Sequence, residues 1–327
     1  MKILVLIPTY NEKDNIGRMI DSVLKINYTE TVKNCGASVD ILIIDDNSPD
    51  GTRQIVKEFI KKQKNRDAGN GVEDRDCFAN ARNDGKGGAG NGVEAGDCFA
   101  SARNDGEVGK GGAGNGVEGR DCFANARNDG NDGVEGEGGD GVGGGSLFLI
   151  EREKKLGLGT AYTAAFNFAV EKGYDYALTM DCDFSHNPEE IAGFVSLMKA
   201  EKCGMIVGSR YSGGIRIINW SMKRLLISYF ANIYAKLVTG VKISDLTGGF
   251  NMYDVNCLKK INLGGISSRG YAFQIEMKYR VLKEAGCSFK EYPIIFYERT
   301  MGKSKMSNGI IFEAFFGVIK LRLGFYK

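Results

Sequence analysis

Three groups of acidic side chains have the types and spacing to hold a charged ligand. Asp181 and Asp183 stand one residue apart in the segment LTMDCDFSHNP. Two further groups are Asp45-Asp46, at the end of an aliphatic run, and Glu12 in PTYNE. Neighbouring carboxylates repel each other, which raises one pKa unless a cation lies between them. Because Mg²⁺ and Mn²⁺ join carboxylate oxygens to phosphate oxygens, the pattern predicts a polyanionic ligand held through a divalent cation.

The DxD pair has two other interpretations, a shared proton and a solvated loop. The apolar run before it indicates a strand, in which successive side chains point to opposite faces. Asp181 and Asp183 are then expected on one face, with Cys182 pointing away. His186, a few residues further on, is expected to face solvent in a loop.

Several other kinds of site are excluded by their patterns. The segment 157–162, GLGTAY, lacks the third glycine of a dinucleotide-binding turn, and no segment matches the phosphate-binding loop GxxxxGK[ST]. The chain has a single histidine. That excludes a His-rich zinc site and weakens serine–histidine or cysteine–histidine catalysis.

Strands and helices that alternate along the chain must position the acidic groups. The pattern indicates an α/β protein with a mostly parallel, doubly wound sheet and helices on both faces. The predicted strands are 3–7, 39–44, 147–150 and 176–180, and the predicted helices are 15–25, 52–62 and 160–171. Ligands bind such sheets at the carboxyl ends of the strands. The segments 8–12, 45–46 and 181–183 all follow strands, so we expect them at one rim.

The passage 64–146 differs in composition from the rest of the chain. Its segment DCFANARNDG begins at Asp76, and close copies begin at Asp97 and Asp121, at unequal intervals. The passage is rich in Gly, Asn and Asp, and it cannot bury enough apolar surface to offset its ordering entropy. We interpret it as a long, disordered, duplicated insertion that leaves the fold at the rim opposite the acidic groups. A calcium-binding nonapeptide array is the alternative, but its GGxGxD pattern does not recur.

Composition narrows the class of protein. The 327 residues are 43% hydrophobic and carry a formal charge of +2, so we expect a sizeable core and no nucleic-acid partner. Eight irregularly spaced cysteines without a CxxC indicate reduced thiols rather than a disulfide framework. The first residues lack a signal-peptide pattern, and no apolar run reaches the roughly 18–20 residues of a membrane-spanning helix. We therefore expect a cytoplasmic protein.

Seven segments, in order, resemble the successive motifs of dolichol-phosphate (polyprenol-monophosphate) mannosyltransferases. They are PTYNEKDN (8–15), IIDDNSPDGT (43–52), KLGLGTAY (155–162), MDCDFSHNP (180–188), SDLTGGFNMY (244–253), GYAFQIEM (270–277) and ERTMGKSKMS (298–307). The resemblance covers essentially everything outside 64–146. It implies an inverting family 2 glycosyltransferase with the Rossmann-like GT-A fold, whose catalytic domain comprises 1–63 and 147–308.

The resemblance also implies a role for each matching residue. Asp181 and Asp183 are the ligands of Mg²⁺ or Mn²⁺ and, with Arg210, the catalytic residues. Arg299 and Lys305 carry positive charge for the phosphates, and the glycine between them indicates a loop that closes over the site. The residues implied to bind the nucleotide sugar are Pro8, Tyr10, Glu12, Ile44, Asp46, Asp181, Cys182, Asp183, Arg210, Arg299 and Lys305.

The implied reaction moves mannose from GDP-mannose to a polyprenyl (dolichyl-type) monophosphate. A lipid monophosphate is already an anionic nucleophile, which accounts for the missing catalytic base. Two residues depart from the family's pattern, since Asn47 stands where DDGSPDG has glycine and Cys182 replaces the usual alanine. The first change is mild because asparagine tolerates turn dihedrals. The Cys182 side chain is expected to point away from the metal.

The tail 309–327 has the spacing of an amphipathic helix. Glu313, Lys320 and Lys327 belong to a narrow stripe, and aromatic and aliphatic residues cover much of the rest. The pattern indicates either an interfacial helix on a membrane or a helix packed on the catalytic domain. The segment 220–227, basic and then apolar, is a second edge that suits a membrane. We expect peripheral association with the cytoplasmic face of a membrane, directly or through a small anchoring partner.

Alternatives remain open at this stage. Base and sugar selection depend on few side chains, so UDP-glucose or a related donor is the alternative substrate. From a different class, the chain is an inactive relative that serves as a binding subunit, although every motif residue is present. At single positions, Arg210 also suits a surface ion pair, and Gln274 and Glu276 suit a structural role as well as a catalytic one.

Overall fold

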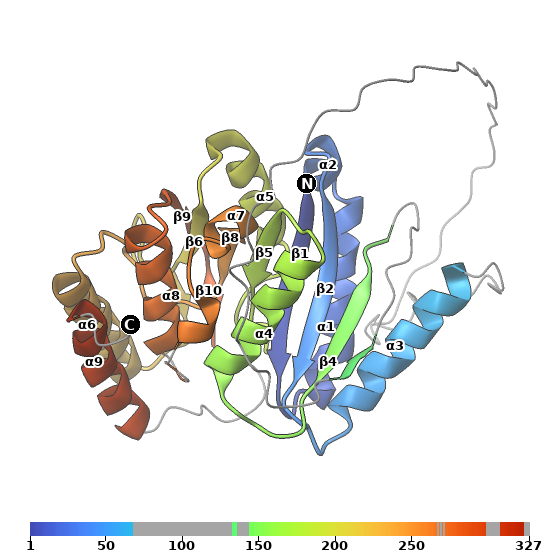
Figure 1. Ribbon diagram of the computed structural model, residues 1–327, viewed down its shortest axis with the longest axis horizontal. Coiled ribbons are helices and arrows are strands. Elements are labelled where there is room, and N and C mark those ends of the chain that lie inside the picture. The colour runs from blue at the N-terminus through green and yellow to red at the C-terminus, as the bar shows by residue number, and fades with distance from the viewer. Residues whose placement is uncertain are drawn as a thin grey trace, which may run out of the picture. The chain divides into compact units, whose positions relative to one another are not determined.

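An eight-stranded sheet with helices on both faces forms the body of the protein (Figure 1). The computed structural model describes residues 1–67, 133–135, 144–266, 268, 270, 272–298 and 308–323. In space the strands follow the order β3-β4-β2-β1-β5-β8-β6-β9, and a second, two-stranded sheet pairs β10 with β7. The strands are β1 (Lys2–Thr9), β2 (Ser38–Asp45), β3 (Gly133–Glu135), β4 (Leu147–Glu151), β5 (Tyr176–Thr179), β6 (Met205–Ser209), β7 (Ile217–Ile218), β8 (Asn251–Asp254), β9 (Phe289–Pro293) and β10 (Phe296–Tyr297). The α-helices are α1 (Lys13–Lys25), α2 (Glu30–Asn34), α3 (Thr52–Asp67), α4 (Leu158–Glu171), α5 (Glu190–Glu201), α6 (Met222–Thr239), α7 (Val255–Leu258), α8 (Ala272–Lys283) and α9 (Asn308–Arg322).

The centre of the large sheet is parallel. β1 pairs in parallel with β2 and β5, and β4 pairs in parallel with the other edge of β2. Such strands are buried on both faces and are therefore rich in Val, Ile and Leu, as in KILVLIPT and SVDILIID. β8 runs antiparallel between β5 and β6. The prediction of a mostly parallel α/β sheet is confirmed.

Side-chain alternation along the strands divides the core between the two faces of the sheet. Leu4 and Leu6 of β1 pack on the face covered by α4, α7 and α8 with parts of α6 and α9. Ile3, Val5 and Ile7 pack on the face covered by α1, α2, α3 and α5. Each large aliphatic side chain that is fully buried contributes roughly 1.5–3 kcal/mol of transfer free energy. The strands that carry the site at their carboxyl ends thus rest on packed cores on both sides.

The predicted elements are all present, and their ends differ by only a few residues except at α3. This helix continues to Asp67, past the predicted start of the insertion at 64. At the far end of the passage, residues 133–135 form the edge strand β3, antiparallel to β4. The prediction that the whole of 64–146 is disordered is therefore wrong at both margins. Residues 68–132 and 136–143 lie outside the described residues.

The Gln63 side chain joins the two ends of the passage. Its Nε2 donates to the carbonyl of Gly145 at 2.6 Å, and its Oε1 accepts from the backbone N–H of Leu147 at 3.1 Å. Leu147 pairs with Ile41 in the first half of β2, whereas Asp45 ends that strand. The two ends of the passage are therefore connected at the rim opposite the acidic groups, as predicted. Within the passage, however, Gly133 of β3 pairs with Glu151 at the acidic rim, so the prediction that the whole passage stays away from that rim is wrong.

A disulfide joins Cys257 of α7 to Cys287, between α8 and β9. The expectation that all cysteines are reduced is wrong for this pair, although Cys35, Cys182 and Cys203 are free thiols. The two partners meet because both segments pack over Gly204, where an added Cβ would lie 2.5 Å from Cβ of Cys287. This proximity depends on tertiary packing, which the irregular cysteine spacing does not encode.

We expect reduction of this disulfide to lower stability markedly. The bond closes a loop with a sequence separation of 30, for which the chain-entropy estimate is about 3–4 kcal/mol. Thermal unfolding with and without reductant measures the effect, and the double variant Cys257→Ser/Cys287→Ser should unfold at the lower temperature under both conditions. Cys35→Ser, which alters a free thiol, is the matched control. A wild-type melting temperature that ignores reductant would contradict the expectation.

The last described helix, α9, packs against α6 and α8. The Tyr234 and Phe315 rings stack with centroids 4.5 Å apart, and Val318 and Leu321 are buried. Phe316 and Leu323 are exposed. Of the two interpretations of the tail, packing on the catalytic domain holds for one side of this helix. Within the described ranges, no helix has both the length and the apolar character to cross a bilayer.

Candidate active site

Asp45 holds the first loops of the site together. Its fully buried carboxylate accepts from Oγ1 of Thr9 at 3.2 Å, from the backbone N–H of Ser48 at 3.0 Å and from Nε of Arg53 at 3.1 Å. These bonds connect β1, β2 and α3, so Asp45 has a structural role. Asn47, in the turn that follows, adopts a φ of +58°, which asparagine tolerates better than most residues.

Asp46 is paired with Arg152, a residue that sequence reasoning missed. Nη1 of Arg152 donates to Oδ1 of Asp46, and Nη2 donates to Oγ1 of Thr160 in the first turn of α4 at 2.7 Å. Burial raises the pKa of Asp46, and the charge of Arg152 acts against this rise. Nothing in its spacing distinguishes Arg152, because its partner lies 106 residues away.

The other residues implied to hold the nucleotide differ in exposure. Pro8, Tyr10 and Glu12 follow or end β1 and are half-buried, whereas Ile44 is fully buried in the core. Nζ of Lys155, in the loop before α4, lies 4.0 Å from the centre of the Tyr10 ring. The first three side chains can therefore contact a ligand at this rim, and Ile44 can only support the floor beneath them.

We expected the DxD segment to continue strand β5, but it lies beyond the end of that strand. β5 ends at Thr179, so the alternation of strand side chains does not apply to the two aspartates. The Asp181 side chain is 43% exposed, whereas Asp183 is only 7% exposed and its Oδ1 accepts from N and Oγ of Ser185 at 3.1 and 2.6 Å. The Cys182 side chain is buried in the core on the α1–α5 face, so it points away from the site. Burial raises the pKa of its thiol well above the ordinary value.

His186 is buried, which contradicts the expectation that it faces solvent. It is 2% exposed, and its ring stacks on Phe250 and meets the Phe296 ring edge to face, with centroids 5.0 and 5.3 Å away. Its Nδ1 accepts from the backbone N–H of Asp181 at 3.2 Å, so that nitrogen carries no proton. Burial lowers the pKa of His186 to about 4. The 3.9 Å approach of Nδ1 to Oδ2 of Asp181 is therefore not an ion pair at neutral pH.

We expect His186 to make the protein less stable in mild acid. The pKa is near 6.5 in the unfolded chain and about 4 in the folded one, so the unfolded chain binds the extra proton first. The contribution of neutral His186 to the free energy of unfolding is fully present above pH 6.5. As the pH falls toward 4, the free energy of unfolding decreases by on the order of 2 kcal/mol. Urea unfolding of wild type and His186→Phe at pH 7 and 4.5 measures this. Equal losses in the two proteins would contradict it.

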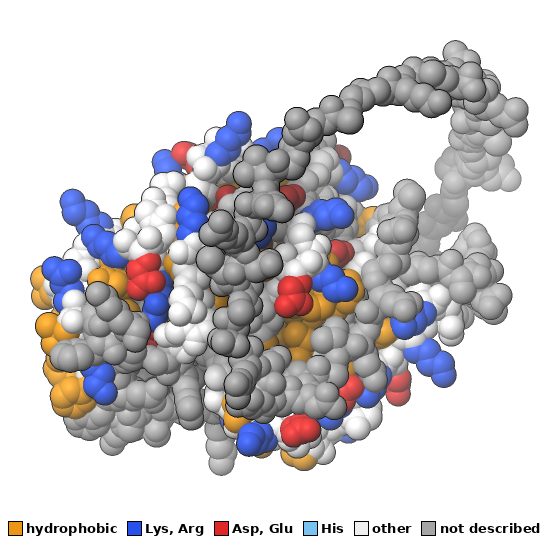
Figure 2. Space-filling model, viewed as in Figure 1, with side chains coloured by type: hydrophobic (Ala, Val, Ile, Leu, Met, Phe, Trp, Pro, Cys, Tyr) orange, Lys and Arg blue, Asp and Glu red, His pale blue; other side chains and the backbone are white. Residues whose placement is uncertain are grey.

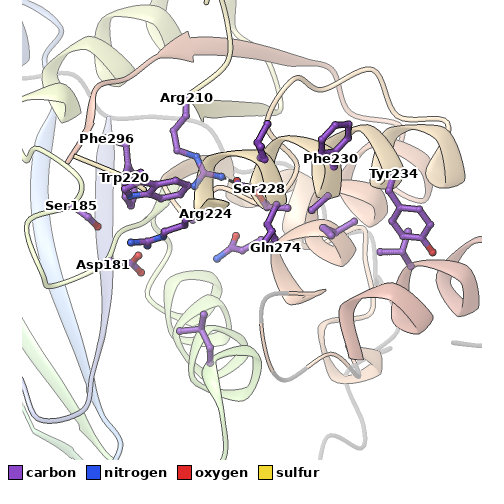
Figure 3. Close-up of a pocket in the computed structure, with 18 of the residues that line it drawn as sticks. Asp181, Ser185, Arg210, Trp220, Arg224, Ser228, Phe230, Tyr234, Gln274 and Phe296 are labelled. Atoms are coloured by element: carbon purple, nitrogen blue, oxygen red, sulfur yellow. Dashed lines mark hydrogen bonds between the residues drawn. The ribbon is translucent and has the colours of Figure 1, made fainter. Parts of the chain in front are cut away.

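A cavity of about 550 Å³ lies between α6, α8, α9 and the loops that follow β5 and β6 (Figure 3). One end is polar and is lined by Asp181, Arg210, Trp220, Arg224 and Gln274. The other end is apolar and is lined by Phe230, Tyr234, Ile275, Phe315 and Val318. The cavity therefore suits an amphiphile with an ionic head and a hydrocarbon tail.

Arg210 lies at the polar end and is held by Asp245 of the SDLTGGF segment. Its Nε and Nη2 donate to the two carboxylate oxygens at 2.6 and 2.7 Å, and Nη2 also donates to Oγ1 of Thr247 at 2.8 Å. Both partners are buried, so Arg210 is in a buried ion pair rather than the surface pair that was the alternative. Burial opposes ionisation of Asp245, but Arg210 and Lys278 outweigh it and the pKa of Asp245 is lowered.

Arg224 is a second cation at this end, and sequence reasoning assigned its segment only to a membrane edge. Its guanidinium lies 4.0 Å from the centre of the Trp220 ring, and Nη1 pairs with Oε1 of Glu298 at 3.0 Å. Its Nε is buried and has no hydrogen-bond acceptor among the described residues. A buried donor of this kind suits an anionic ligand. The residue is in the sequence segment WSMKR, but helical spacing alone does not reveal which basic residue faces the cavity.

Gln274 and Glu276, the two polar residues of the GYAFQIEM segment, have different roles. Gln274 lines the cavity, and its Oε1 accepts from Nδ2 of Asn251 at 3.2 Å. Glu276 is buried away from the cavity, where it pairs with Arg280 at 2.8 Å and accepts from the backbone N–H of Ser268 at 3.1 Å. Glu276 is therefore structural.

The donor set fits a divalent ion that is completed by its substrate. In the part of the chain that the structure describes, no three His, Cys, Asp or Glu side chains gather as a metal site. Among the described residues, Asp181 and Asp183 are the candidate hard oxygen ligands, and Mg²⁺ in proteins is commonly held by one or two carboxylates plus substrate phosphates. Arg299 and Lys305, the cations expected on the closing loop, lie outside the described residues.

Solved structures with a similar architecture establish the fold. Glucosyl-3-phosphoglycerate synthase from Mycobacterium tuberculosis, solved with Mn²⁺, UDP and glucosyl-3-phosphoglycerate, aligns with a TM-score of 0.52 at 12% identity over 99% of this chain and 80% of that one. Another mycobacterial protein aligns with a TM-score of 0.53 at 12% identity over 99% of this chain and 75% of that one. At this identity the likeness concerns the fold, which is the GT-A fold.

Two curated relatives are more similar in sequence. An undecaprenyl-phosphate mannosyltransferase of Micrococcus luteus is 37% identical over 175 residues, which are 54% of this chain and 71% of the relative. A polyprenol monophosphomannose synthase of Mycolicibacterium smegmatis is 40% identical over 172 residues, 53% of this chain. The match spans 64% of that second protein's length.

A family sequence model also matches the chain. The sequence model described as "Glycosyl transferase family 2" matches residues 4–94 and 142–261, more than half of the chain. The matched part contains the acidic rim, the DxD segment and Arg210. The chain is an enzyme of glycosyl transferase family 2.

Proposed function

We propose that the protein transfers mannose from GDP-mannose to a polyprenyl monophosphate, with inversion at the anomeric carbon. The observation that carries the proposal is the cavity, whose polar end at Asp181, Arg210 and Arg224 continues into an apolar groove between α6, α8 and α9. A lipid phosphate has this same division between an anionic head and a hydrocarbon tail. The names of the two curated relatives, which both concern polyprenyl carriers and mannose, support the proposed acceptor and the proposed sugar.

The donor is assigned to the rim formed by the ends of β1, β2 and β5. The half-buried side chains of Pro8, Tyr10 and Glu12 suit the base and ribose, with Asp46 fixed beside them by Arg152. Asp181 and Asp183 would hold Mg²⁺ or Mn²⁺. That ion would supply positive charge to the departing diphosphate.

The acceptor is assigned to the cavity. A phosphate monoester is ionised at neutral pH, so it needs no general base, and the neutral His186 ring is not required as one. Arg224 and the Arg210–Asp245 pair would bind the phosphate at the polar end and orient one oxygen toward the sugar. Holding the two reactants in line supplies much of the rate enhancement in such a reaction.

A membrane surface is the proposed site of action. Exposed apolar side chains recur on one side of α6, and hydrophobic atoms gather in the region of α6 and α9 in Figure 2. They are Met222, Leu226, Phe230, Ile233, Leu237 and, on α9, Phe316 and Leu323. Because the apolar end of the cavity lies between the same helices, a lipid tail can pass from it into a bilayer. We propose peripheral attachment at the cytoplasmic face, with or without a small anchoring partner.

Radiolabelled nucleotide sugars test the function. Purified full-length protein is incubated with a C55 or dolichyl phosphate, Mg²⁺ or Mn²⁺, and labelled GDP-mannose or UDP-glucose. We expect label in the lipid fraction from GDP-mannose, as the β-linked product. If label is transferred only from UDP-glucose, the proposed donor GDP-mannose is wrong. If no donor supports transfer, the binding-subunit alternative is favoured.

A further inference from the structure

A buried lysine beneath the polar end of the cavity has no part in the chemistry described so far. Lys278 of α8 is fully buried, and its Nζ donates to the carbonyls of Leu246 and Gly248 at 3.1 and 2.6 Å. Withdrawing an ammonium group from water costs several kcal/mol unless its partners compensate. A lysine at this place therefore calls for a specific reason.

The turn that Lys278 holds is a wall of the cavity. Thr247 and Gly249 line the cavity directly. From α6, Oδ1 of Asn232 accepts from the backbone N–H groups of Leu246 and Thr247 at 2.7 and 3.1 Å. Arg210, the residue after β6, binds the Asp245 carboxylate at the start of the same turn. Three elements thus converge on residues 245–248, and Lys278 is the contribution of α8.

The charges around this turn balance only when Lys278 is protonated. Arg210 and Asp245 form a pair with no net charge, so an anion beside Arg210 would meet a neutral ion pair. Lys278 adds a second cation to the same carboxylate. The next charged group that faces it is Glu291 of β9, which is half-buried and accepts from N and Oγ of Ser244 at 2.8 and 2.9 Å. Arg210, Asp245 and Glu291 together carry one negative charge, so protonated Lys278 makes the cluster neutral, whereas neutral Lys278 leaves it negative.

We propose that Lys278 is a positioning residue for the phosphate group of the acceptor. Its ammonium group holds the 246–248 turn in place and cancels the net negative charge of Arg210, Asp245 and Glu291, which would otherwise repel an anion beside Arg210. The inference rests on the proposed function only in taking a phosphate monoester as the ligand of the cavity.

The role of Lys278 makes anion binding depend on pH. Burial lowers the pKa of Lys278 to about 7, while Asp245 and Glu291 act to raise it and Arg210 lowers it further. A phosphate dianion close by favours the protonated form and raises this pKa. Binding then takes up a proton above pH 7. Affinity therefore falls as the pH rises, since a smaller fraction of the free protein has Lys278 charged.

The test uses farnesyl phosphate, a short soluble probe, and the fluorescence of Trp220, the single tryptophan of the chain and a lining residue of the cavity. The phosphate is largely a dianion between pH 7.5 and 9, so its own titration contributes little. We expect wild-type affinity to fall about tenfold over this range. Lys278→Met should bind about tenfold more weakly at pH 7.5, with little dependence on pH. Lys278→Arg, which stays charged, should restore binding and remove the fall.

Controls separate this role from a purely structural one. Lys290→Met, which removes an exposed lysine of β9 paired with Glu201, should bind like wild type. If Lys278→Met does not fold, calorimetry of wild type at pH 8 in two buffers of different ionisation enthalpy decides, since the inference requires net proton uptake on binding. Wild-type affinity in Lys278→Met, a fall with pH that persists in Lys278→Arg, or no proton uptake would overturn it. Failure of mannose transfer with pH-dependent binding intact would instead contradict the proposed function.

Discussion

Replacing Asp181 by asparagine is expected to slow sugar transfer by about 10²–10³-fold and to leave the fold intact. The carboxylate is 43% exposed at the polar end of the cavity, where it is one of the two hard oxygen ligands that we propose for a divalent ion. The amide keeps the shape of the side chain but removes the charge that would bind the ion. Less positive charge then remains to stabilise the departing diphosphate.

The neighbouring aspartate provides the informative comparison. Asp183→Asn should also lose activity, but it should lose stability as well, by about 1–3 kcal/mol, because its buried carboxylate accepts two bonds from Ser185. Sequence reasoning assigned this residue a purely ligating role.

Asp175→Asn, at the opposite end of β5, is the matched control and should transfer sugar normally. Mn²⁺ binding in the presence of GDP, followed by electron paramagnetic resonance, gives a readout that is independent of turnover. Normal transfer by Asp181→Asn in the presence of chelator would rule out the divalent mechanism.

Arg224→Met is expected to raise the KM for the lipid acceptor by about 10–100-fold, with little change in the KM for GDP-mannose. The guanidinium is stacked on Trp220 and held by Glu298 at the polar end of the cavity, so it is preorganised for a phosphate. Arg224→Lys retains the charge but loses the planar fork and the stacking, so an intermediate KM is expected. The effect is expected mainly on the acceptor because Arg224 lines the cavity, whereas Tyr10 and Glu12, proposed to hold the base and ribose, do not.

Steady-state kinetics with each substrate varied in turn measure this split. Arg216→Met removes an exposed arginine that does not line the cavity and should behave like wild type. Titration of Trp220 fluorescence with farnesyl phosphate reports acceptor binding without turnover. An acceptor KM that stays unchanged, or equal increases in the KM for both substrates, would show that Arg224 does not hold the acceptor phosphate.

The parts of the molecule that could be predicted are those whose cause is local. β1 and β2 were recognisable because strands buried on both faces must be continuously aliphatic. Their carboxyl ends share a rim because parallel strands point the same way, so Glu12, Asp46 and the DxD segment could be placed together. The positive φ of Asn47 likewise follows from the turn chemistry of its own segment.

Errors arose where a local pattern was extended beyond its element. The alternation assumed for Asp181 and Asp183 requires a strand, but β5 ends at Thr179. His186 is polar and follows a loop, which favours exposure, yet two aromatic rings from other elements enclose it. The pairing of Cys257 with Cys287 required α7 and the segment after α8 to meet over Gly204.

The sequence by itself determined the order of the elements, the sheet they form and the rim that carries the acidic residues, since hydrophobic period and strand direction are properties of short segments. Tertiary structure alone decided which charges are paired and which face the cavity. Arg152 meets Asp46 across 106 residues, Arg210 meets Asp245 across 35, and Arg224 meets Glu298 across 74. The energy of an ion pair depends on the distance between its charges and on their burial. Both quantities exist only once β6, α6 and α8 have packed together, which is why Lys278 could not be distinguished from a surface lysine before the fold was known.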